Sequence, residues 1–324
     1  MKWNVGIVTG CCLVASALLL GQEQREPRAP DPERIGLPTI TGDTMAPDIP
    51  GVVKGGTKVQ LLKIWDRKHG GEGPVGMPKS DDVLFTLDDP FRIGRINLNT
   101  GEISTYIENG TARVLAVIYD LKGRLIGTQQ GPAGLALLST SPRSMLADKF
   151  EGKPIASAND LVADSKNGVY FTGAGPETIL YLTPQGQVIR ATAEAARPNG
   201  IQLSADGKVV YTGTLPADVI TAYDVQPDGR LTNPHPFAQV AEKGQPSGVD
   251  GIATDGAGRL YTSANAGVQV ISPQGKILGT IPFPLKPRNL AFAGKDRKTL
   301  FVVARGGAFK VQMLAEGPRG GRSK

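Results

Sequence analysis

The sequence predicts an all-β fold, a six-bladed β-propeller, on three observations. Short runs rich in β-branched and aromatic residues recur along the chain, and a turn with Gly or Asp precedes most of them. The first residues of six such runs stand 42, 44, 40, 51 and 40 positions apart. A period of about 40 to 50 residues built from strands is typical of propeller blades. The runs span residues 83–87, 125–128, 169–172, 209–212, 260–263 and 300–304.

Tight turns separate these runs from their neighbours. Gly, Asn and Asp dominate the turns, and Gly and Asn accept the positive φ that a tight hairpin needs. A second strand and turn follow most runs, as at 178–186, so each repeat carries two hairpins. Two hairpins give a four-stranded blade, and twisted blades bury their faces by stacking around a central channel. A β-sandwich also has evenly spaced strands, but six matching units favour the propeller. The clearest turns stand at 121–123, 165–168, 205–207 and 255–258.

The composition fits a globular domain with many turns. Apolar residues make up 40% of the 324 and charged residues 20%, which argues against wholesale disorder. Helical signal is nearly absent, because 191–196 is the only run of good helix formers and is too short to stand alone. The formal charge of +6 is spread along the chain without a basic strip interleaved with aromatic residues. No nucleic-acid partner is therefore expected.

Residues 1–21 have the pattern of a signal peptide. Lys2 precedes an apolar run at 5–20, and a polar stretch follows, which is the order of a secretory signal. Cleavage after Ala17 or after Gly21 would leave an exported protein, periplasmic or extracellular, with no membrane segment. An uncleaved membrane anchor is the alternative, although the run is shorter than the ~20 residues that a membrane span prefers.

Three further segments follow the signal peptide. Residues 22–50 are rich in Pro, Gly and acidic residues and show no apolar period, so they are expected to be a linker or an arm lying on the domain. The propeller is expected at 51–315, and 316–324 is expected to be a disordered basic tail. Both cysteines, Cys11 and Cys12, lie within the signal peptide, so the mature protein is expected to have no disulfide. The oligomeric state is not predicted.

Four polar residues do not fit a plain alternation of buried and exposed strand positions. Each stands at a similar offset upstream of a different blade's turn and strand, so the repeat predicts that their side chains converge at one end of the channel. Two carboxylates and two amide carbonyls are hard oxygen ligands, which suit Ca²⁺, Mg²⁺ or Mn²⁺. Asn and Asp beside Gly are also common turn formers, which is the alternative explanation for each one alone. The four residues are Glu72, Asn159, Asn199 and Asp250.

His69 stands three residues before Glu72. An imidazole there could reach the channel mouth as a proton shuttle or substrate contact, because its unperturbed pKa lies near neutrality. The alternative is a solvated loop residue. A serine nucleophile is not predicted, because the chain has no Gly-x-Ser-x-Gly motif.

Five short motifs follow one another along the chain past Val52. They are Glu72-Gly-Pro74, Asn159-Asp-Leu161, Arg197-Pro-Asn-Gly200, Asp250-Gly-Ile252 and Pro287-Arg-Asn-Leu-Ala-Phe292. No single motif is specific, but their order and spacing together are. On these motifs, nearly the whole chain past Val52 resembles the family of senescence marker protein 30, gluconolactonase and related calcium-dependent lactonases.

The resemblance implies a hydrolase that opens a small-molecule lactone, a sugar lactone above all, and the predicted signal peptide makes it a secreted one. It implies one divalent cation in the channel, with Ca²⁺ favoured and Mg²⁺, Mn²⁺ or Zn²⁺ as alternatives, held by Glu72, Asn199 and Asp250. Asn159 would be a further ligand or a substrate contact, and Asp250 would also be the catalytic base. As a hypothesis, the cation would polarise the lactone carbonyl and acidify a bound water while Asp250 takes the proton.

Two other functions stay open. A propeller can bind a ligand or a protein without catalysis, because the fold alone does not define the function. A metal-free relative resembling strictosidine synthase is the other possibility, although such proteins need not keep these ligands. The chain also departs from the family pattern, since 171–174 supplies no Asp and the second blade has no Asn-Gly pair before its strand.

Overall fold

The computed structural model describes residues 36–108, 110, 112–140, 142–173, 178–193, 195, 197–214, 218–240 and 249–318. The chain divides into two units, Met1–Asp31 and Pro32–Lys324, and the described residues belong to the second. The predicted signal peptide, the first part of the predicted linker and most of the predicted basic tail lie outside them. No helix among the described residues is long and apolar enough to cross a membrane.

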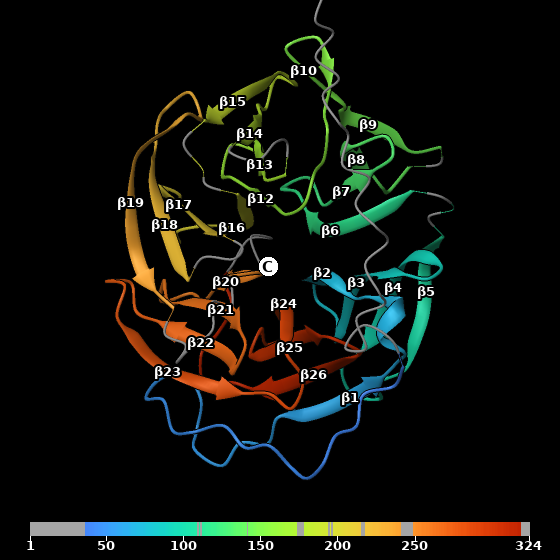
Figure 1. The fold of residues 1–324 in the computed structure, drawn as a ribbon, viewed down its shortest axis with the longest axis vertical. Helices are drawn as coiled ribbons and strands as arrows, with labels where there is room; N and C mark the ends of the chain where they lie inside the picture. Colours follow the sequence, from blue (N-terminus) through green and yellow to red (C-terminus); the bar gives the residue numbers. More distant parts are fainter. Residues whose placement is uncertain are drawn as a thin grey trace, which may run out of the picture. The chain divides into compact units, whose positions relative to one another are not determined.

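Six four-stranded antiparallel sheets form a ring of blades, which confirms the six-bladed β-propeller (Figure 1). Blade 1 is β2 (Glu72–Gly76), β3 (Asp82–Asp88), β4 (Phe91–Asn97) and β5 (Ile103–Glu108). Blade 2 is β6 (Arg113–Tyr119), β7 (Leu125–Gln130), β8 (Gly134–Leu137) and β9 (Ser144–Ala147). Blade 3 is β12 (Leu161–Ala163), β13 (Val169–Phe171), β14 (Ile179–Leu182) and β15 (Val188–Thr192).

The chain continues around the ring through the other three blades. Blade 4 is β16 (Pro198–Leu203), β17 (Val209–Thr214), β18 (Val219–Val225) and β19 (Leu231–Gln239). Blade 5 is β20 (Ile252–Thr254), β21 (Leu260–Ala264), β22 (Gly267–Ile271) and β23 (Ile277–Pro282). Blade 6 is β24 (Pro287–Ala293), β25 (Thr299–Ala304) and β26 (Gly307–Gln312), with β1 (Gln60–Ile64) as its outermost strand. A small hairpin, β10 (Lys149–Phe150) with β11 (Lys153–Pro154), follows blade 2, and the 3₁₀ turn η2 (Arg67–His69) precedes blade 1.

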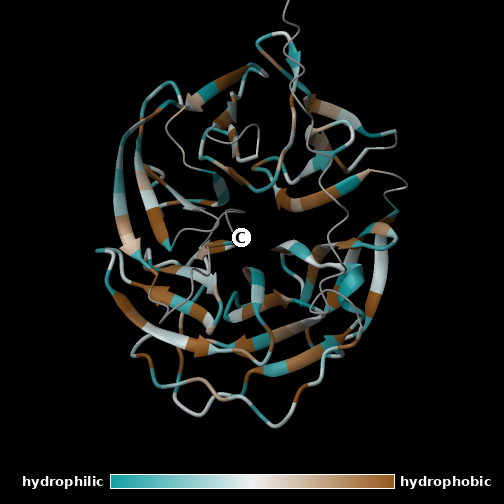
Figure 2. Ribbon diagram, in the orientation of Figure 1, coloured by the Kyte–Doolittle hydropathy of each residue, from teal (hydrophilic) through white to brown (hydrophobic). Residues whose placement is uncertain are grey.

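The six runs that predicted the fold are the second strands of the six blades. These runs are apolar because both faces of each second strand pack against a neighbouring blade. Phe85 in β3 and Phe301 in β25, for example, are fully buried and their rings lie 6.0 Å apart across blades 1 and 6. Figure 2 shows hydrophobic and hydrophilic residues alternating along the strands of the blades. The turns before the runs also have the expected backbone, with positive φ at Gly123, Asn167 and Gly207.

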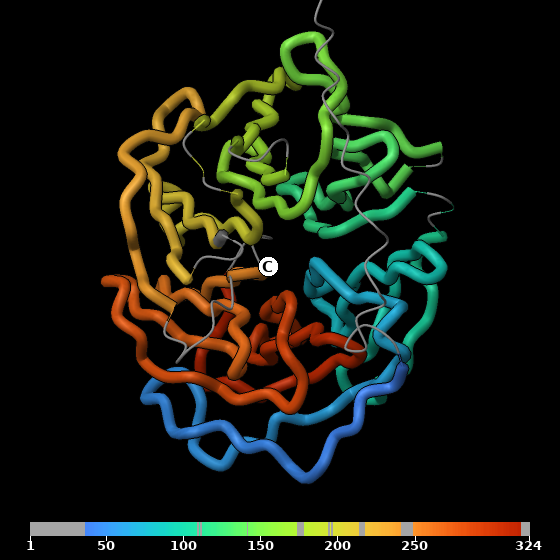
Figure 3. Tube along the Cα trace, in the orientation of Figure 1, coloured from blue at the N-terminus to red at the C-terminus, as the bar shows by residue number. Residues whose placement is uncertain are grey.

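Strand β1 closes the ring. It pairs with β26 from Gln60 opposite Lys310 to Ile64 opposite Gly307, so the first strand of the chain completes the last blade. The path of the chain around the ring, with the two ends of the domain meeting in blade 6, can be followed in Figure 3. This pairing covers the backbone edge of β26, which would otherwise be open to other chains.

An arm precedes β1 and packs on blades 5 and 6. Its backbone forms bridges between Met45 and Lys58 and between Ile49 and Val53. Ala46, Ile49 and Val53 are buried in the same apolar cluster as residues of these two blades. From Met45 onward, the segment therefore lies on the domain as an arm.

Candidate active site

The predicted site residues lie where the inner strands begin. Because every blade has the same inner-to-outer strand order, the inner strands β2, β6, β12, β16, β20 and β24 all start at the same end of the ring. Glu72 is the first residue of β2, Asn199 is the second of β16, and Asn159 and Asp250 precede β12 and β20 by two residues. The register of the repeats thus places all four at one end.

Glu72 lies at the junction of blades 1 and 6. It is 8% exposed, and its Oε1 forms an ion pair with the Arg288 Nε at 2.7 Å. Its Oε2 accepts a hydrogen bond from the backbone N–H of Gly73 at 3.3 Å and from the Asn289 Nδ2 at 3.4 Å. The carboxylate is thus held by its own strand β2 and by the inner strand β24 of blade 6. Arg288 and Asn289 belong to the quoted motif at 287–292, but the sequence assigned them no role.

Asp250 is half-buried at the same end of the channel. Its pKa is raised to about 7, first because burial disfavours the charged carboxylate and then because the negative charge of Glu72 lies close to it. The positive charges of Arg288, Lys286 and Arg305 oppose this rise. The structure therefore brings the two predicted carboxylates together, in surroundings that favour a nearby positive charge.

The two predicted amides also meet. The Asn159 Nδ2 donates a hydrogen bond to the Asn199 Oδ1 at 3.2 Å, between blades 3 and 4. Both side chains are half-buried. An amide pair of this kind leaves the Asn159 carbonyl oxygen, the second lone pair of the Asn199 Oδ1 and the Asn199 amide nitrogen for other partners.

Threonines at the inner ends of the second strands position the loops that carry these amides. The Thr128 Oγ1 donates to the Asn159 backbone oxygen, and the Thr172 Oγ1 donates to the Asn199 backbone oxygen at 2.6 Å. The Thr172 Oγ1 also accepts from the Asp160 N–H at 3.1 Å. Each threonine therefore joins its own blade to the next. These threonines could have been found from the sequence, because Thr recurs in the runs at 83–87, 125–128, 169–172, 209–212 and 260–263.

Replacing Thr172 by Val is expected to destabilise the protein by about 2 kcal/mol, because the isosteric side chain removes two buried hydrogen bonds and leaves the Asn199 carbonyl without its hydroxyl donor. Urea denaturation measures the change. Thr105→Val is the control, since Thr105 is exposed on β5. Equal stability of the two variants would contradict a positioning role for Thr172.

A glycine follows each of three site residues, and its role is close packing. A Cβ on Gly73 would lie 2.1 Å from the Ala116 Cα, and one on Gly200 would lie 1.9 Å from the Asp250 backbone oxygen. A Cβ on Gly251 would lie 2.4 Å from the Asn289 Oδ1. Gly200 and Gly251 do not have positive φ, so a tight turn is not the reason for a glycine at either position. These glycines let the inner strands approach one another at the channel end.

His69 lies in η2 beside the loop between β3 and β4. Its Nδ1 contacts the Asp89 backbone oxygen and lies 4.0 Å from the Asp89 Oδ2, and about a third of the side chain is exposed. These contacts are with the loop between β3 and β4 and not with the carboxylate of Glu72. A role of His69 in substrate binding stays a prediction.

The donor set suits a divalent cation of the hard class. Among the described residues no group of three or more His, Cys, Asp and Glu could hold a metal ion, so any ligand set here must include amide or backbone oxygens. Glu72 and Asp250 supply two mutually repelling carboxylates, and a cation between them would relieve the repulsion that raises the pKa of Asp250. Asn159 and Asn199 supply amide oxygens at the same end. The residues present therefore fit the predicted ion.

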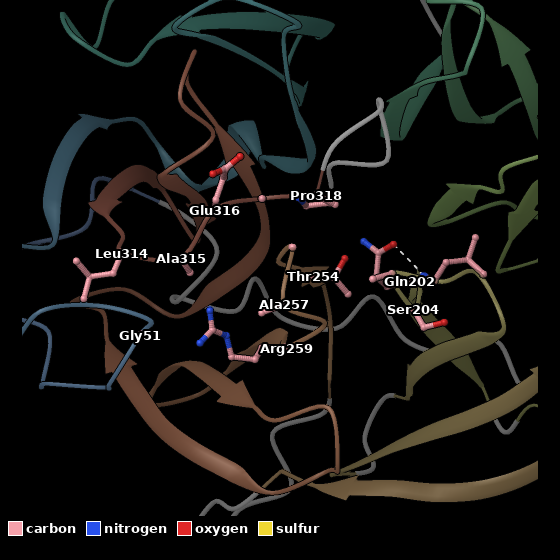
Figure 4. Close-up of a pocket in the computed structure, with 14 residues that line it drawn as sticks. Gly51, Gln202, Ser204, Thr254, Ala257, Arg259, Leu314, Ala315, Glu316 and Pro318 are labelled. Carbon is pink, nitrogen blue, oxygen red and sulfur yellow. Dashed lines mark hydrogen bonds between the residues drawn. The ribbon is translucent and has the colours of Figure 1, made fainter.

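A separate cavity of about 570 Å³ lies at the other end of the inner strands (Figure 4). Gln202 and Thr254, near the ends of β16 and β20, line it together with Glu316 of the C-terminal segment. The Gln202 Oε1 accepts a hydrogen bond from the Leu203 N–H at 2.9 Å, drawn as a dashed line. None of the five predicted site residues lines this cavity. The four predicted residues Glu72, Asn159, Asn199 and Asp250 therefore lie at the opposite end of the inner strands from this cavity.

Fold and site together define a six-bladed propeller with two carboxylates and two amides gathered at one channel end. The chain belongs to the SMP-30/Gluconolactonase/LRE-like family, whose model matches residues 70–306.

Individual relatives agree with this assignment. The chain is 26% identical to a gluconolactonase of Zymomonas mobilis over 269 residues, which cover 72% of this chain and 75% of the relative. The solved structure of a putative gluconolactonase superposes with a TM-score of 0.74 at 22% identity, covering 85% of this chain and all of the other. A calcium-binding protein, regucalcin, from Agrobacterium tumefaciens gives a TM-score of 0.67 at 19% identity, covering 81% and 95% of the two chains.

Proposed function

We propose that the protein is a divalent-metal-dependent hydrolase that opens a sugar lactone, with Asp250 as the base. The observation that carries the proposal is the proximity of the Glu72 charge to Asp250 at the channel end that also holds the hydrogen-bonded Asn159 and Asn199, in a chain of this family. The name of the Zymomonas relative supports a lactone substrate, and that of the calcium-binding neighbour supports Ca²⁺ as the ion. Glu72, Asn199 and Asp250 would hold the ion, with Asn159 as a further ligand or a contact to the sugar.

The reaction needs a base for water and an acid for the leaving oxygen. Asp250 takes a proton from the attacking water, whose oxygen forms a bond to the lactone carbonyl carbon. The ring C–O bond then breaks, and Asp250 returns the proton to the leaving ring oxygen, giving a hydroxy acid. The pKa of about 7 belongs to the metal-free site, and a bound cation would lower this pKa and so favour the ionised carboxylate that takes the proton from water. When bound, the cation supplies Lewis-acid polarisation of the lactone carbonyl.

The neighbouring side chains prepare Asp250 for this role. The Arg288 guanidinium neutralises Glu72 through the 2.7 Å ion pair, so the site does not carry two uncompensated negative charges. The close packing of Gly200 against the Asp250 backbone oxygen positions the backbone from which the carboxyl group extends. The Asn159 and Asn199 amides can orient hydroxyl groups of a sugar ring, because each has both donor and acceptor atoms.

Purified domain is expected to open glucono-δ-lactone faster than the buffer does, and a chelator is expected to abolish that rate. Added Ca²⁺ should restore it, and metal analysis should find about one ion per chain. Proton release at constant pH measures the hydrolysis, with a protein-free sample as the control for spontaneous opening. No bound metal and no turnover on a panel of lactones would overturn the proposal and favour a non-catalytic binding propeller.

A further inference from the structure

A small cavity of about 230 Å³ lies between blades 6, 1 and 2, at the end of the ring where the inner strands begin. Five cationic side chains line it, together with Gly70 and the carboxylate of Asp88. They come from η2, from the starts of β6 and β24, and from the turn between β25 and β26. The cationic residues are Arg67, Lys68, Arg113, Arg288 and Arg305.

Among the residues that line this cavity, five are cationic and one, Asp88, is acidic. Asp88 is matched by Arg113, which binds it through two hydrogen bonds of 2.7 Å each. Glu72 is matched by Arg288 at 2.7 Å, and the exposed Lys68 lies 3.6 Å from Asp89. Arg67 and Arg305 also line the wall, and the positive charge of Arg305 acts on the nearby Asp250 carboxyl as well. A group of arginines around a small volume is suited to an oxyanion, because planar guanidinium groups match its geometry.

The cavity adjoins the proposed catalytic site. Arg288 belongs to both, since it lines the cavity and its Nε holds the Glu72 carboxylate. A ligand whose reacting group lies at Glu72 and Asp250 therefore needs only to extend past Arg288 to place a substituent among the arginines.

We propose that this cavity, called here the basic subsite, binds an oxyanion substituent of the lactone: a phosphate, sulfonate or carboxylate. The preferred substrate is then an acidic sugar lactone rather than a neutral one. The inference rests on the proposed lactonase function and specifies its substrate class.

The test compares two lactones that differ in an anionic substituent on C6. Wild-type protein is expected to show a kcat/KM at least about tenfold higher for glucono-δ-lactone carrying a 6-phosphate or 6-sulfonate than for the unsubstituted lactone. The double variant Arg67→Gln/Arg305→Gln should reduce this ratio by at least about tenfold, whereas the Arg→Lys pair should retain part of it. Lys153→Gln, on the exposed hairpin strand β11, is the matched control for charge removal and should leave the ratio unchanged.

Two kinds of failure remain distinguishable. Turnover of both lactones with no preference for the charged one, or a preference that the double variant keeps, would overturn the basic subsite and leave the lactonase function standing. If neither lactone is opened, the proposed function fails. The basic subsite is then tested by the binding of inorganic phosphate, measured by calorimetry. Binding to wild type that the double variant loses would support the basic subsite, and equal behaviour of the two proteins would overturn it.

Discussion

Replacing Asp250 by Asn is expected to lower the rate of lactone hydrolysis by about a thousandfold while making the metal-free protein more stable at pH 8. The rate falls because the amide cannot take a proton from water, and general-base catalysis typically contributes about 10²- to 10⁴-fold. Glu72, the nearest other carboxylate, is held by Arg288 and Asn289 and cannot replace it. The initial rate of proton release at constant pH measures the loss.

The gain in stability follows from the raised pKa of Asp250. Its usual value is 3.8, and in the folded protein it is about 7, so between these pH values the folded state keeps a proton that the unfolded chain releases. Wild-type stability therefore falls as the pH rises from about 4 to about 7, and the loss is complete above the folded pKa. The neutral amide avoids this cost, so Asp250→Asn should gain about 2 kcal/mol at pH 8 and almost nothing at pH 4.

Denaturation in the presence of a chelator at pH 4, 6 and 8 measures this dependence. Glu102→Gln is the matched control, because Glu102 is exposed and its substitution should change stability little at any of these pH values. If the variant still folds and binds metal and hydrolyses the lactone at the wild-type rate, Asp250 is not the base. A variant with the same stability profile as wild type would show that the Asp250 charge is not disfavoured in the folded state.

The fold was predictable because its strongest signal is local. The second strand of each blade is buried between two blades, so its apolar run and the turn before it repeat along the sequence. The closure of the ring was not predicted, since the pairing of β1 with β26 joins segments far apart in the chain and leaves no repeat. The packing of Ala46 and Ile49 was left open for the same kind of reason, because a Pro-rich arm has no apolar period.

The convergence of the four site residues was predictable from their equal offsets within the blades. The contacts that surround them were not. The pairing of Glu72 with Arg288 depends on ring closure, which brings the first and last blades together, and no offset within one repeat encodes it. The glycines after the site residues were visible in the sequence, but a Gly beside Asn or Asp is typical of a turn, and only the neighbouring blade shows why the Cβ must be absent.

Replacing Gly200 by Ala is expected to destabilise the protein by about 3 kcal/mol or more and to lower turnover with it. The backbone at Gly200 has no positive φ, so alanine would fit the local conformation of β16. The obstacle is the adjoining blade, because the added Cβ would lie 1.9 Å from the Asp250 backbone oxygen and 3.2 Å from the Ile252 Cγ1. Atoms cannot approach so closely, so blades 4 and 5 must separate or Asp250 must move.

Gly123→Ala separates this packing effect from the general cost of replacing a glycine. Gly123 has a φ of +73° in an exposed turn with no atom within 4 Å of an added Cβ, so its substitution should cost only about 1 kcal/mol of backbone strain and leave kcat unchanged. Urea denaturation and lactone turnover, measured on both variants, distinguish the two causes. If Gly200→Ala resembles Gly123→Ala in both measurements, the contact between blades 4 and 5 does not position Asp250. If it loses both stability and turnover, the close approach of the inner strands is what holds the catalytic carboxyl group at the channel end.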